Sequence, residues 1–597
     1  MRRSRAVRAG SVLAAAVLAL SACSGGTDDK AGVNVDVNSM KTGKGESVDD
    51  YKLADAPESE EVKVGVDDSF TSYNANVPGA GHPGANAVLT AVLAKPFELD
   101  GANKVLLNRD VMDSVTVLNK DPQVVQWKIK ADVKWSDGQP WSCRDLYLSW
   151  LAQSGAAKGA DGKPVFTAAD SSGYNLVDSA SCKDETTFEA HFKKPYLDYK
   201  ALFSTTGWVL PAHVLEAKAG IPDVTKLTPA GDPAVLKKAA DFWNKGWRDF
   251  TPELMPASGP YKIAAVDKNA ESVTLEKNPQ WAGAKGGPKK VTIRAIKDKN
   301  EMASALENGE LDVISSSQPD ESVTKKLQGL SGKGVVCGST QQLSFEHLDF
   351  NYKRMFGDIA LRKAFMAAVD RKAIVDKLIK PVYSDAQPLG SVQFFQGESG
   401  YQDRYSTKSG LGPEAAAKIL TDAGWTKDPD GIFAKNGKRF EVTVTYAPSD
   451  LRANAAQLII SQAKQAGILV HGEADPKFTK GRAQQGGFDI ALFGWSQAPF
   501  KAEGAEVYRT AANGPSHNWQ GLSDPKIDQA FTAAVSATDP AEATKQYAAA
   551  DQAIADQYAT LPLFATPAIW AFRGIDRVYL QSYNGVLWNV GEWARTS

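Results

Sequence analysis

Short stretches in which polar and apolar residues alternate recur along the chain, and they predict β-strands. Residues 61–66 alternate in this way. So do residues 125–129, which are followed by a Ser-Asp-Gly turn at 136–138 and a helix-like run over 142–150. Strands and helices continue to interleave without a repeat of fixed period. The predicted class is therefore mixed α/β, with open sheets flanked by helices.

Helix signals are clearest in the second half of the chain. After Asp358, a residue suited to cap a helix, apolar side chains recur at i, i+3, i+4 and i+7 up to Ala368. Residues 413–423 begin with Pro and are followed by Gly424, the arrangement typical of helix ends. The pair Asn436-Gly437 lies between apolar stretches and predicts a β-hairpin.

The N-terminus has the plan of an export signal. A basic stretch over 2–8 precedes an apolar run over 11–20 that is too short to span a bilayer. The following Leu-Ser-Ala-Cys, ending at Cys23, resembles the lipobox of bacterial lipoproteins, which implies cleavage after residue 22 and acylation of the Cys23 thiol. A plain cleaved signal is the alternative. Residues 23–59 are polar and predict a flexible tether.

Charge and length limit the function classes. The 597 residues include 68 Lys and Arg against 70 Asp and Glu, a net charge of −2, and removal of residues 1–22 takes this to near −6. Nucleic acid is therefore not an expected partner. So long a chain exceeds what one hydrophobic core usually organises, which predicts two or three lobes. No later apolar segment is long enough to span a membrane, so we expect membrane contact through the lipid anchor alone.

The cysteines and histidines indicate structure rather than chemistry. In an oxidising compartment Cys143 and Cys182 are natural partners, and we expect a disulfide between them. Cys337 is then left over, and we interpret it as a small buried apolar residue. The six His show no paired ligand spacing, so we expect no metal site and no cofactor.

Several segments together resemble the family 5 extracellular solute-binding proteins, the oligopeptide and dipeptide receptors of ABC importers. The blocks that carry the resemblance are Trp127 to Ile129, Val133 to Pro140, Asp145 to Trp150, Ser258 to Tyr261, Leu275 to Pro279, Leu306 to Ile314, Leu361 to Phe365, Val369 to Arg371, Phe488-Asp489, Gly494-Trp495 and Leu561 to Phe564. They occur in the family's order and extend over most of residues 60–597.

The resemblance implies a periplasmic-binding-protein-like type II fold, with two lobes and a domain inserted in the first. Carried over, the first lobe comprises 60–108, 251–335 and 557–597, the inserted domain 109–250, and the second lobe 336–556. The ligand is then enclosed as the lobes close.

The resemblance also implies ligand contacts. It places at the cleft, in order of position, Phe70, Tyr73, Gly494, Trp495, Ser496, Asn518 and Trp519. For each of the aromatic residues and for Asn518, ordinary core or loop packing is the alternative interpretation.

One departure from the family pattern bears on the ligand. Peptide-binding members often have an acid shortly after Gly-Trp, which pairs with the ligand's α-amino group, whereas Ser496 to Pro499 contain none. The charge-assisted bond must then come from elsewhere, or the ligand has no free amine. This leaves modified peptides, oligosaccharides, haem and metal chelates as alternatives.

An exported serine acyl-enzyme is the rival from another class. Ser-x-x-Lys patterns begin at Ser322, Ser461 and Ser523, and Lys-Thr-Gly occupies 41–43, ahead of any nucleophile. We interpret these as chance matches and expect no catalysis. The predicted function is a monomeric receptor on the outer face of the cell membrane that binds peptides and delivers them to the permease and ATPase subunits of an ABC transporter.

Overall fold

A ten-stranded mixed sheet runs through the whole molecule. The structure is a computed structural model that describes residues 49–101, 103–317, 321–511 and 517–596. The strand order is β18-β17-β19-β13-β20-β12-β2-β11-β10-β9. The strands span Glu58–Val66 (β2), Tyr261–Asp267 (β9), Ser272–Lys277 (β10), Gly287–Ala295 (β11), Val313–Ser316 (β12), Val335–Phe350 (β13), Glu441–Tyr446 (β17), Leu469–Ala474 (β18), Ile490–Ser496 (β19) and Thr560–Arg573 (β20).

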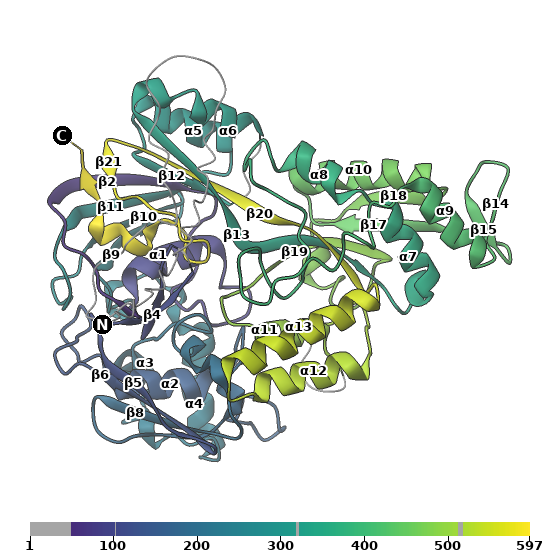
Figure 1. The fold of residues 1–597 in the computed structure, drawn as a ribbon. Helices are drawn as coiled ribbons and strands as arrows, with labels where there is room; N and C mark the ends of the chain where they lie inside the picture. Colours follow the sequence, from purple (N-terminus) through teal and green to yellow (C-terminus); the bar gives the residue numbers. More distant parts are fainter. Residues whose placement is uncertain (1–48, 102, 318–320, 512–516, 597) are drawn as a thin grey trace, which may run out of the picture.

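Two long strands carry this sheet from one lobe to the other. β13 and β20 pair antiparallel from Val335 opposite Arg573 to Asp349 opposite Thr560. On one side β20 pairs with β12, and on the other β13 pairs with β19. Figure 1 shows the two strands crossing the middle of the molecule between the lobes.

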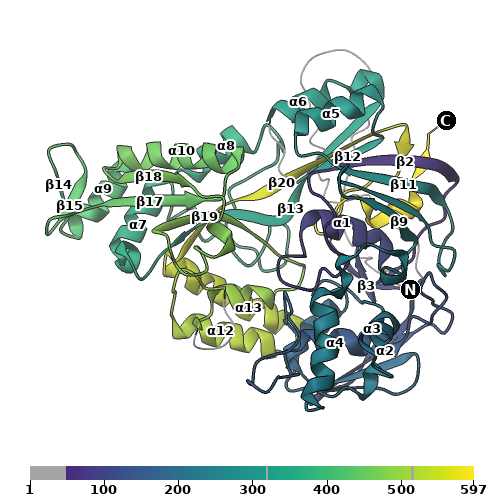
Figure 2. The ribbon, with the colours of Figure 1, turned by 180° about the vertical axis from the view of Figure 1, so that it is seen from behind.

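Each lobe has a hydrophobic core of its own. The first core surrounds β2, β11 and the C-terminal residues up to Trp593, whereas the second surrounds the Phe350 end of β13 and the helices beside it. A smaller cluster under α5 and α6 covers the other face of the first lobe's sheet, and Figures 1 and 2 show α1 on the opposite side. The helices span Pro83–Val92 (α1), Lys299–Asn308 (α5), Glu321–Gln328 (α6), Ile359–Ala368 (α7), Arg371–Leu378 (α8), Pro413–Asp422 (α9), Asp450–Gln465 (α10), Glu503–Tyr508 (α11), Pro525–Ser536 (α12) and Pro540–Asp556 (α13).

A four-stranded antiparallel sheet with three helices is inserted in the first lobe. Its strand order is β5-β6-β8-β7. The elements span Met112–Lys120 (β5), Gln123–Ile129 (β6), Val177–Cys182 (β7), Thr187–Phe192 (β8), Cys143–Gln153 (α2), Ala212–Ala219 (α3) and Pro233–Lys245 (α4). The predicted pair Cys143 and Cys182 is joined by a disulfide, with 5.7 Å between the Cα atoms. Trp127 and Trp243 belong to the same core as Val64, so this unit packs as part of the first lobe.

Local sequence explains several elements. Asp358 caps α7, because its side chain accepts a hydrogen bond from the Ala360 N–H at 2.9 Å. Asn436 and Gly437 both have positive φ, 51° and 75°, as a tight hairpin turn requires. The hairpin strands β15 (Phe433–Lys435) and β16 (Lys438–Arg439) are short, and the next strand, β17, leaves them for the main sheet.

Minor sheets complete the fold. They contain β1 (Asp50–Tyr51), β3 (Phe97–Leu99) and β4 (Val105–Asn108); β14 (Thr426–Lys427) with β15 and β16; and β21 (Ile575–Asp576) with β22 (Ala594–Arg595).

The end of the predicted tether is folded. Asp50 and Tyr51 pair with β4, and Tyr51 and Leu53 are buried in the first core, so the folded body begins before residue 60. These are two large apolar side chains in a segment that is polar as a whole, which is why the composition of 23–59 did not reveal them. The predicted signal peptide and Cys23 lie outside the described residues. Within the described part of the chain, no helix is long and apolar enough to cross a bilayer.

Candidate ligand-binding site

A cavity of about 450 Å³ lies where the two lobes and the inserted unit meet. The first lobe contributes the end of β2, the start of α1 and a C-terminal loop over 580–586. The inserted unit contributes Asp170 and residues 204–208. The second lobe contributes Gln342 to Ser344 of β13, Ser496 at the end of β19, and Glu503 at the start of α11. The size of the cavity is that of a small-molecule site.

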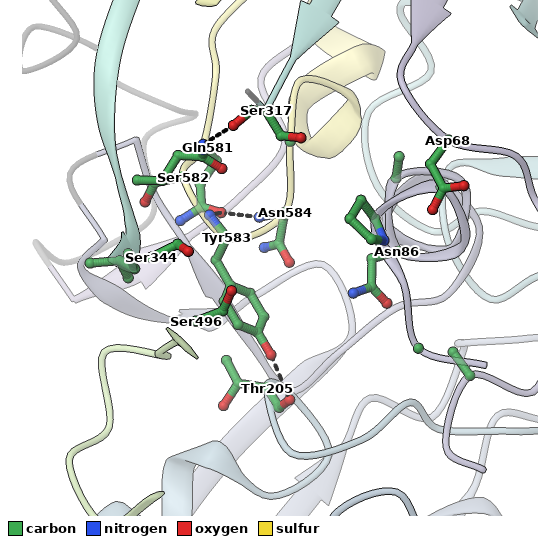
Figure 3. A pocket seen from close by; sticks show the side chains of 18 of the residues that line it. Asp68, Asn86, Thr205, Ser317, Ser344, Ser496, Gln581, Ser582, Tyr583 and Asn584 are labelled. Carbon is green, nitrogen blue, oxygen red and sulfur yellow. Dashed lines mark hydrogen bonds between the residues drawn. The ribbon is translucent and has the colours of Figure 1, made fainter. Parts of the chain in front are cut away.

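The C-terminal loop forms a fixed polar wall. The Tyr583 hydroxyl donates to the Thr205 carbonyl at 2.9 Å, and the Gln581 side-chain oxygen accepts from the Tyr583 N–H at 2.8 Å (Figure 3). The Asn584 side-chain oxygen accepts from Lys95 Nζ at 3.2 Å. Figure 3 shows the side chains of Asn584 and Asn86 pointing into the same space. The wall is thus built of amides and hydroxyls that bond to one another and to neighbouring loops, which fixes its shape.

Two acids at the end of β2 are already engaged. Asp67 Oδ2 accepts from the N–H and the hydroxyl of Ser317, at 2.6 and 2.9 Å. Burial raises the pKa of Asp67. Asp68 Oδ2 lies 2.9 Å from Nδ1 of His82. These contacts hold the loop after β2 in place.

A second group of acids lies between the inserted unit and α11. Burial raises the pKa of Glu503 to about 8, and the nearby Asp170 carboxylate adds to this shift. Burial followed by the charge of Asp170 likewise raises the pKa of Glu506 to about 7, and the Ser172 hydroxyl donates to Glu506 at 3.4 Å. Burial raises the pKa of Asp198 to about 6, and its Oδ2 accepts from the Ala502 N–H at 3.0 Å.

The cavity wall is therefore acidic. Asp67, Asp68, Asp170 and Glu503 line it, whereas no Lys or Arg does so among the described residues. A cation behind the wall, Lys95, is 2% exposed and lies 4.4 Å above the Trp208 ring. Its charge is turned toward Asn584 and that ring rather than into the cavity.

Of the seven predicted contacts, Ser496 lines this cavity. Trp495 instead packs in an aromatic cluster with ring centroids 5.2 Å from Phe493 and 5.0 Å from Trp519. Gly494 lies against Glu346, where an added Cβ would be 3.0 Å from a carboxylate oxygen. The binding role of these residues stays a prediction.

The other predicted residues have structural contacts. The Asn518 amide donates to the carbonyls of Arg509 and Leu522, and its oxygen accepts from the Gly521 and Leu522 N–H groups, so it organises the loop. Phe70 and Tyr73 are buried in the first core, and Tyr73 donates to the Pro256 carbonyl at 2.5 Å. Asn518, Phe70 and Tyr73 do not line the cavity.

Sequence reasoning missed the 581–585 loop and the acids Asp170 and Glu503. Glu503 lies eight positions after Trp495, beyond the segment searched for an acid. Asp170 lies more than 300 positions away, and no local pattern marks it. The charges counted along one segment cannot reveal Asp170 and Glu503 as a pair, because only the fold brings them together.

Two lobes that share crossing strands and form a cavity between them define a bilobed ligand-binding protein. The profile of the bacterial extracellular solute-binding proteins, family 5, matches residues 108–550, and the chain belongs to that family.

Characterised and uncharacterised relatives agree with this assignment. The chain is 27% identical over 494 residues to the oligopeptide-binding protein OppA of Mycobacterium tuberculosis, covering 82% of this chain and 76% of the relative. It is 26% identical over 556 residues to an uncharacterized lipoprotein of the same organism, covering 89% and 92%.

Solved structures share the fold. The periplasmic EDTA-binding protein EppA superposes with a TM-score of 0.81 at 24% identity, covering 93% of this chain and all of that one. The oligopeptide-binding protein AppA of Bacillus subtilis, in complex with a nonapeptide, gives 0.70 at 19% identity, covering 91% and 100%. The predicted type II periplasmic-binding-protein fold is confirmed.

Proposed function

We propose that this protein is a lipid-anchored receptor that binds peptides between its two lobes and delivers them to an ABC importer. The observation that carries the proposal is the cavity at the junction of both lobes and the inserted unit. Membership of the solute-binding family and the similarity to an oligopeptide-binding protein support the peptide assignment.

The cavity walls suit an extended peptide. Ser344 and Ser496, which are opposite each other in the β13 and β19 ladder, both reach the wall where this ladder ends. A peptide backbone that pairs with strand backbone left open beyond the end of such a ladder forms hydrogen bonds without regard to its side chains. Ligand contacts made to both lobes stabilise the closed arrangement, so occupancy is coupled to shape, and the permease then distinguishes loaded from empty receptor.

Ligand-dependent stabilisation of the full-length chain in mild detergent tests the binding. Trialanine at 100 times its Kd should raise the free energy of unfolding by about 2.7 kcal/mol, without turnover of the peptide. Trp495→Ala should weaken binding while the chain stays folded, and unchanged affinity would remove Trp495 from the site. Stabilisation by an oligosaccharide or a haem, with none by peptides, would replace the peptide assignment.

Two further measurements address the anchor and the chemistry. Cys23→Ser should release the chain from the membrane fraction into the medium, and mass spectrometry of the wild-type N-terminus should find an acylated Cys23. Hydrolysis of an acyl substrate that disappears in Ser322→Ala would contradict the receptor and support an enzyme.

A further inference from the structure

We propose that the interlobe cavity selects ligands that carry an organic cation, an ammonium or a guanidinium group, held between Asp170 of the inserted unit and Glu503 of α11. The inference rests on the proposed receptor function and specifies the substrate class of the same site.

The first argument is the absence of a built-in counterion. Asp67 and Asp68 have partners within the first lobe, as described above. Asp170 accepts one hydrogen bond, from the Ser172 N–H at 2.8 Å, and Glu503 accepts one from the backbone N–H of Ala498. Among the described residues, neither carboxylate has a Lys or Arg within ion-pair distance. The Asp170 charge acts on His517, but burial lowers the pKa of that imidazole. An ammonium or guanidinium ligand supplies the missing positive charge and several donors.

The second argument is an unused donor in the same cavity. Asn584 is 4% exposed, and its side-chain oxygen accepts from Lys95. Within the described part of the chain its amide nitrogen donates no hydrogen bond, and Figure 3 shows it pointing into the cavity. This nitrogen is open to the cavity, so a group bound there can accept a hydrogen bond from it. A ligand carbonyl in the cavity would accept a hydrogen bond from the Asn584 amide, so the site suits a ligand that has an acceptor as well as a cation.

The charge of the wall also disfavours anionic ligands. A carboxylate-rich chelate would meet four acids and no Lys or Arg on the described wall. A bare metal ion is not the expected cation either, since no group of three or more His, Cys, Asp or Glu in the described residues is arranged to hold one. An organic cation with a nearby carbonyl, as in a peptide with a Lys or Arg side chain, fits both observations.

The two acids belong to different lobes, so the cation would bridge them. Without a ligand, Asp170 and Glu503 repel each other when both are charged, and burial adds to the cost of charging Glu503. The other titratable groups that act on Glu503 are Asp198 and Glu506, and its own charge acts on Tyr196 and Tyr583. Lys501 is paired with Glu398 at 2.6 Å. A bound cation favours the charged form of Glu503, so binding should release a proton near pH 7.

The test uses the full-length chain in mild detergent and the N-acetylated forms of three peptides of similar size, Ala-Lys-Ala, Ala-Gln-Ala and Ala-Glu-Ala, so that the Lys side chain is the only ammonium group among them. Calorimetry should rank their affinities in that order, with Ala-Lys-Ala at least roughly 10-fold tighter than Ala-Gln-Ala. Titration in two buffers of different ionisation enthalpy should show proton release with the Lys peptide. Glu503→Gln should remove both the preference and the proton release while Ala-Gln-Ala binds as before.

Two variants complete the design. Glu506→Gln removes a carboxylate on the same helix that does not line the cavity, so it should change the preference far less than Glu503→Gln. Asp170→Asn removes the acid on the other lobe and should also lower the preference for Ala-Lys-Ala. This variant tests the inference if Glu503→Gln does not fold.

Equal affinity for the three peptides, or a preference that survives both cavity variants, would overturn the inference. If no peptide binds, the proposed function fails, and arginine and spermidine are compared with citrate and Fe(III)-EDTA. Binding of the cations alone would then support the charge selection, and any other result would overturn it.

Discussion

Reduction of the Cys143–Cys182 disulfide should destabilise the first lobe by an amount that can be calculated. The bond closes a loop with a sequence separation of 39 residues. In the chain-entropy model a loop of this length restricts the unfolded chain by about 4 kcal/mol at 25 °C. Cys143 begins α2 and Cys182 ends β7, so the bond ties a helix to the edge of the inserted sheet.

The size of the melting shift reports which part of the molecule unfolds together. The inserted unit shares the first core, so we expect it to unfold with the first lobe as a body of about 300 residues. At ~2.1 cal/mol/K per residue, 4 kcal/mol then lowers Tm by about 6 °C. If the inserted unit of about 140 residues unfolded alone, the same loss would lower Tm by about 14 °C.

Calorimetry of the oxidised and reduced protein measures this shift. The Cys143→Ala/Cys182→Ala variant should have the lower Tm of the reduced wild type, with or without reductant. Cys337→Ala should show the same drop in Tm on reduction as the wild type. A shift below about 2 °C on complete reduction would refute the loop-entropy reasoning.

Three further changes test other parts of the structure. Arg452→Ala should lower the free energy of urea unfolding by about 3–5 kcal/mol, because Glu346 is 2% exposed and accepts from Arg452 at 2.8 and 3.0 Å. Adding Glu346→Gln to this variant should recover part of the loss. The control Lys418→Ala breaks an exposed pair with Asp422 and should cost less than about 0.5 kcal/mol. The raised pKa of Glu503 means that the native state retains a proton that the unfolded state has released, so the free energy of unfolding should fall as pH rises from about 4.5 to about 8; a Glu503→Gln variant with the same pH dependence as the wild type would contradict this. Gly84→Ala should destabilise by about 1–3 kcal/mol, since a Cβ there would be 2.4 Å from the Asp68 carbonyl oxygen; Gly332→Ala, with open space around it, is the control, and equal melting of the two variants would count against the reasoning.

Local features of the fold were predictable because local rules determine them. The helix expected over 413–423 is observed as Pro413–Asp422, and the Asn436-Gly437 turn has the expected backbone. The destination of the strand after that turn was not predictable in the same way. β17 reads as the second arm of a hairpin, yet it pairs with β18 and β19, which are distant in sequence.

The site was less predictable, since it is assembled from distant segments. Family resemblance directed attention to Trp495, whose ring packs against Phe493 and Trp519. The charge of the cavity depends on Asp170 and Glu503, which only the packing of the inserted unit against α11 brings together. Neither residue stands in a motif, so no reading of adjacent positions could assign them.

The ladder between β13 and β20 is interrupted where it passes the cavity. Regular pairing stops at Gln341 opposite Pro567 and resumes at Phe345 opposite Ala565, and the residues between, Gln342 to Ser344, line the cavity. A two-stranded ribbon resists twisting where its inter-strand hydrogen bonds are intact. The β13 and β20 ribbon therefore twists most easily where this pairing is interrupted. A solute bound in the cavity would contact this interrupted section of the connecting ribbon, where torsion between the lobes meets the least resistance.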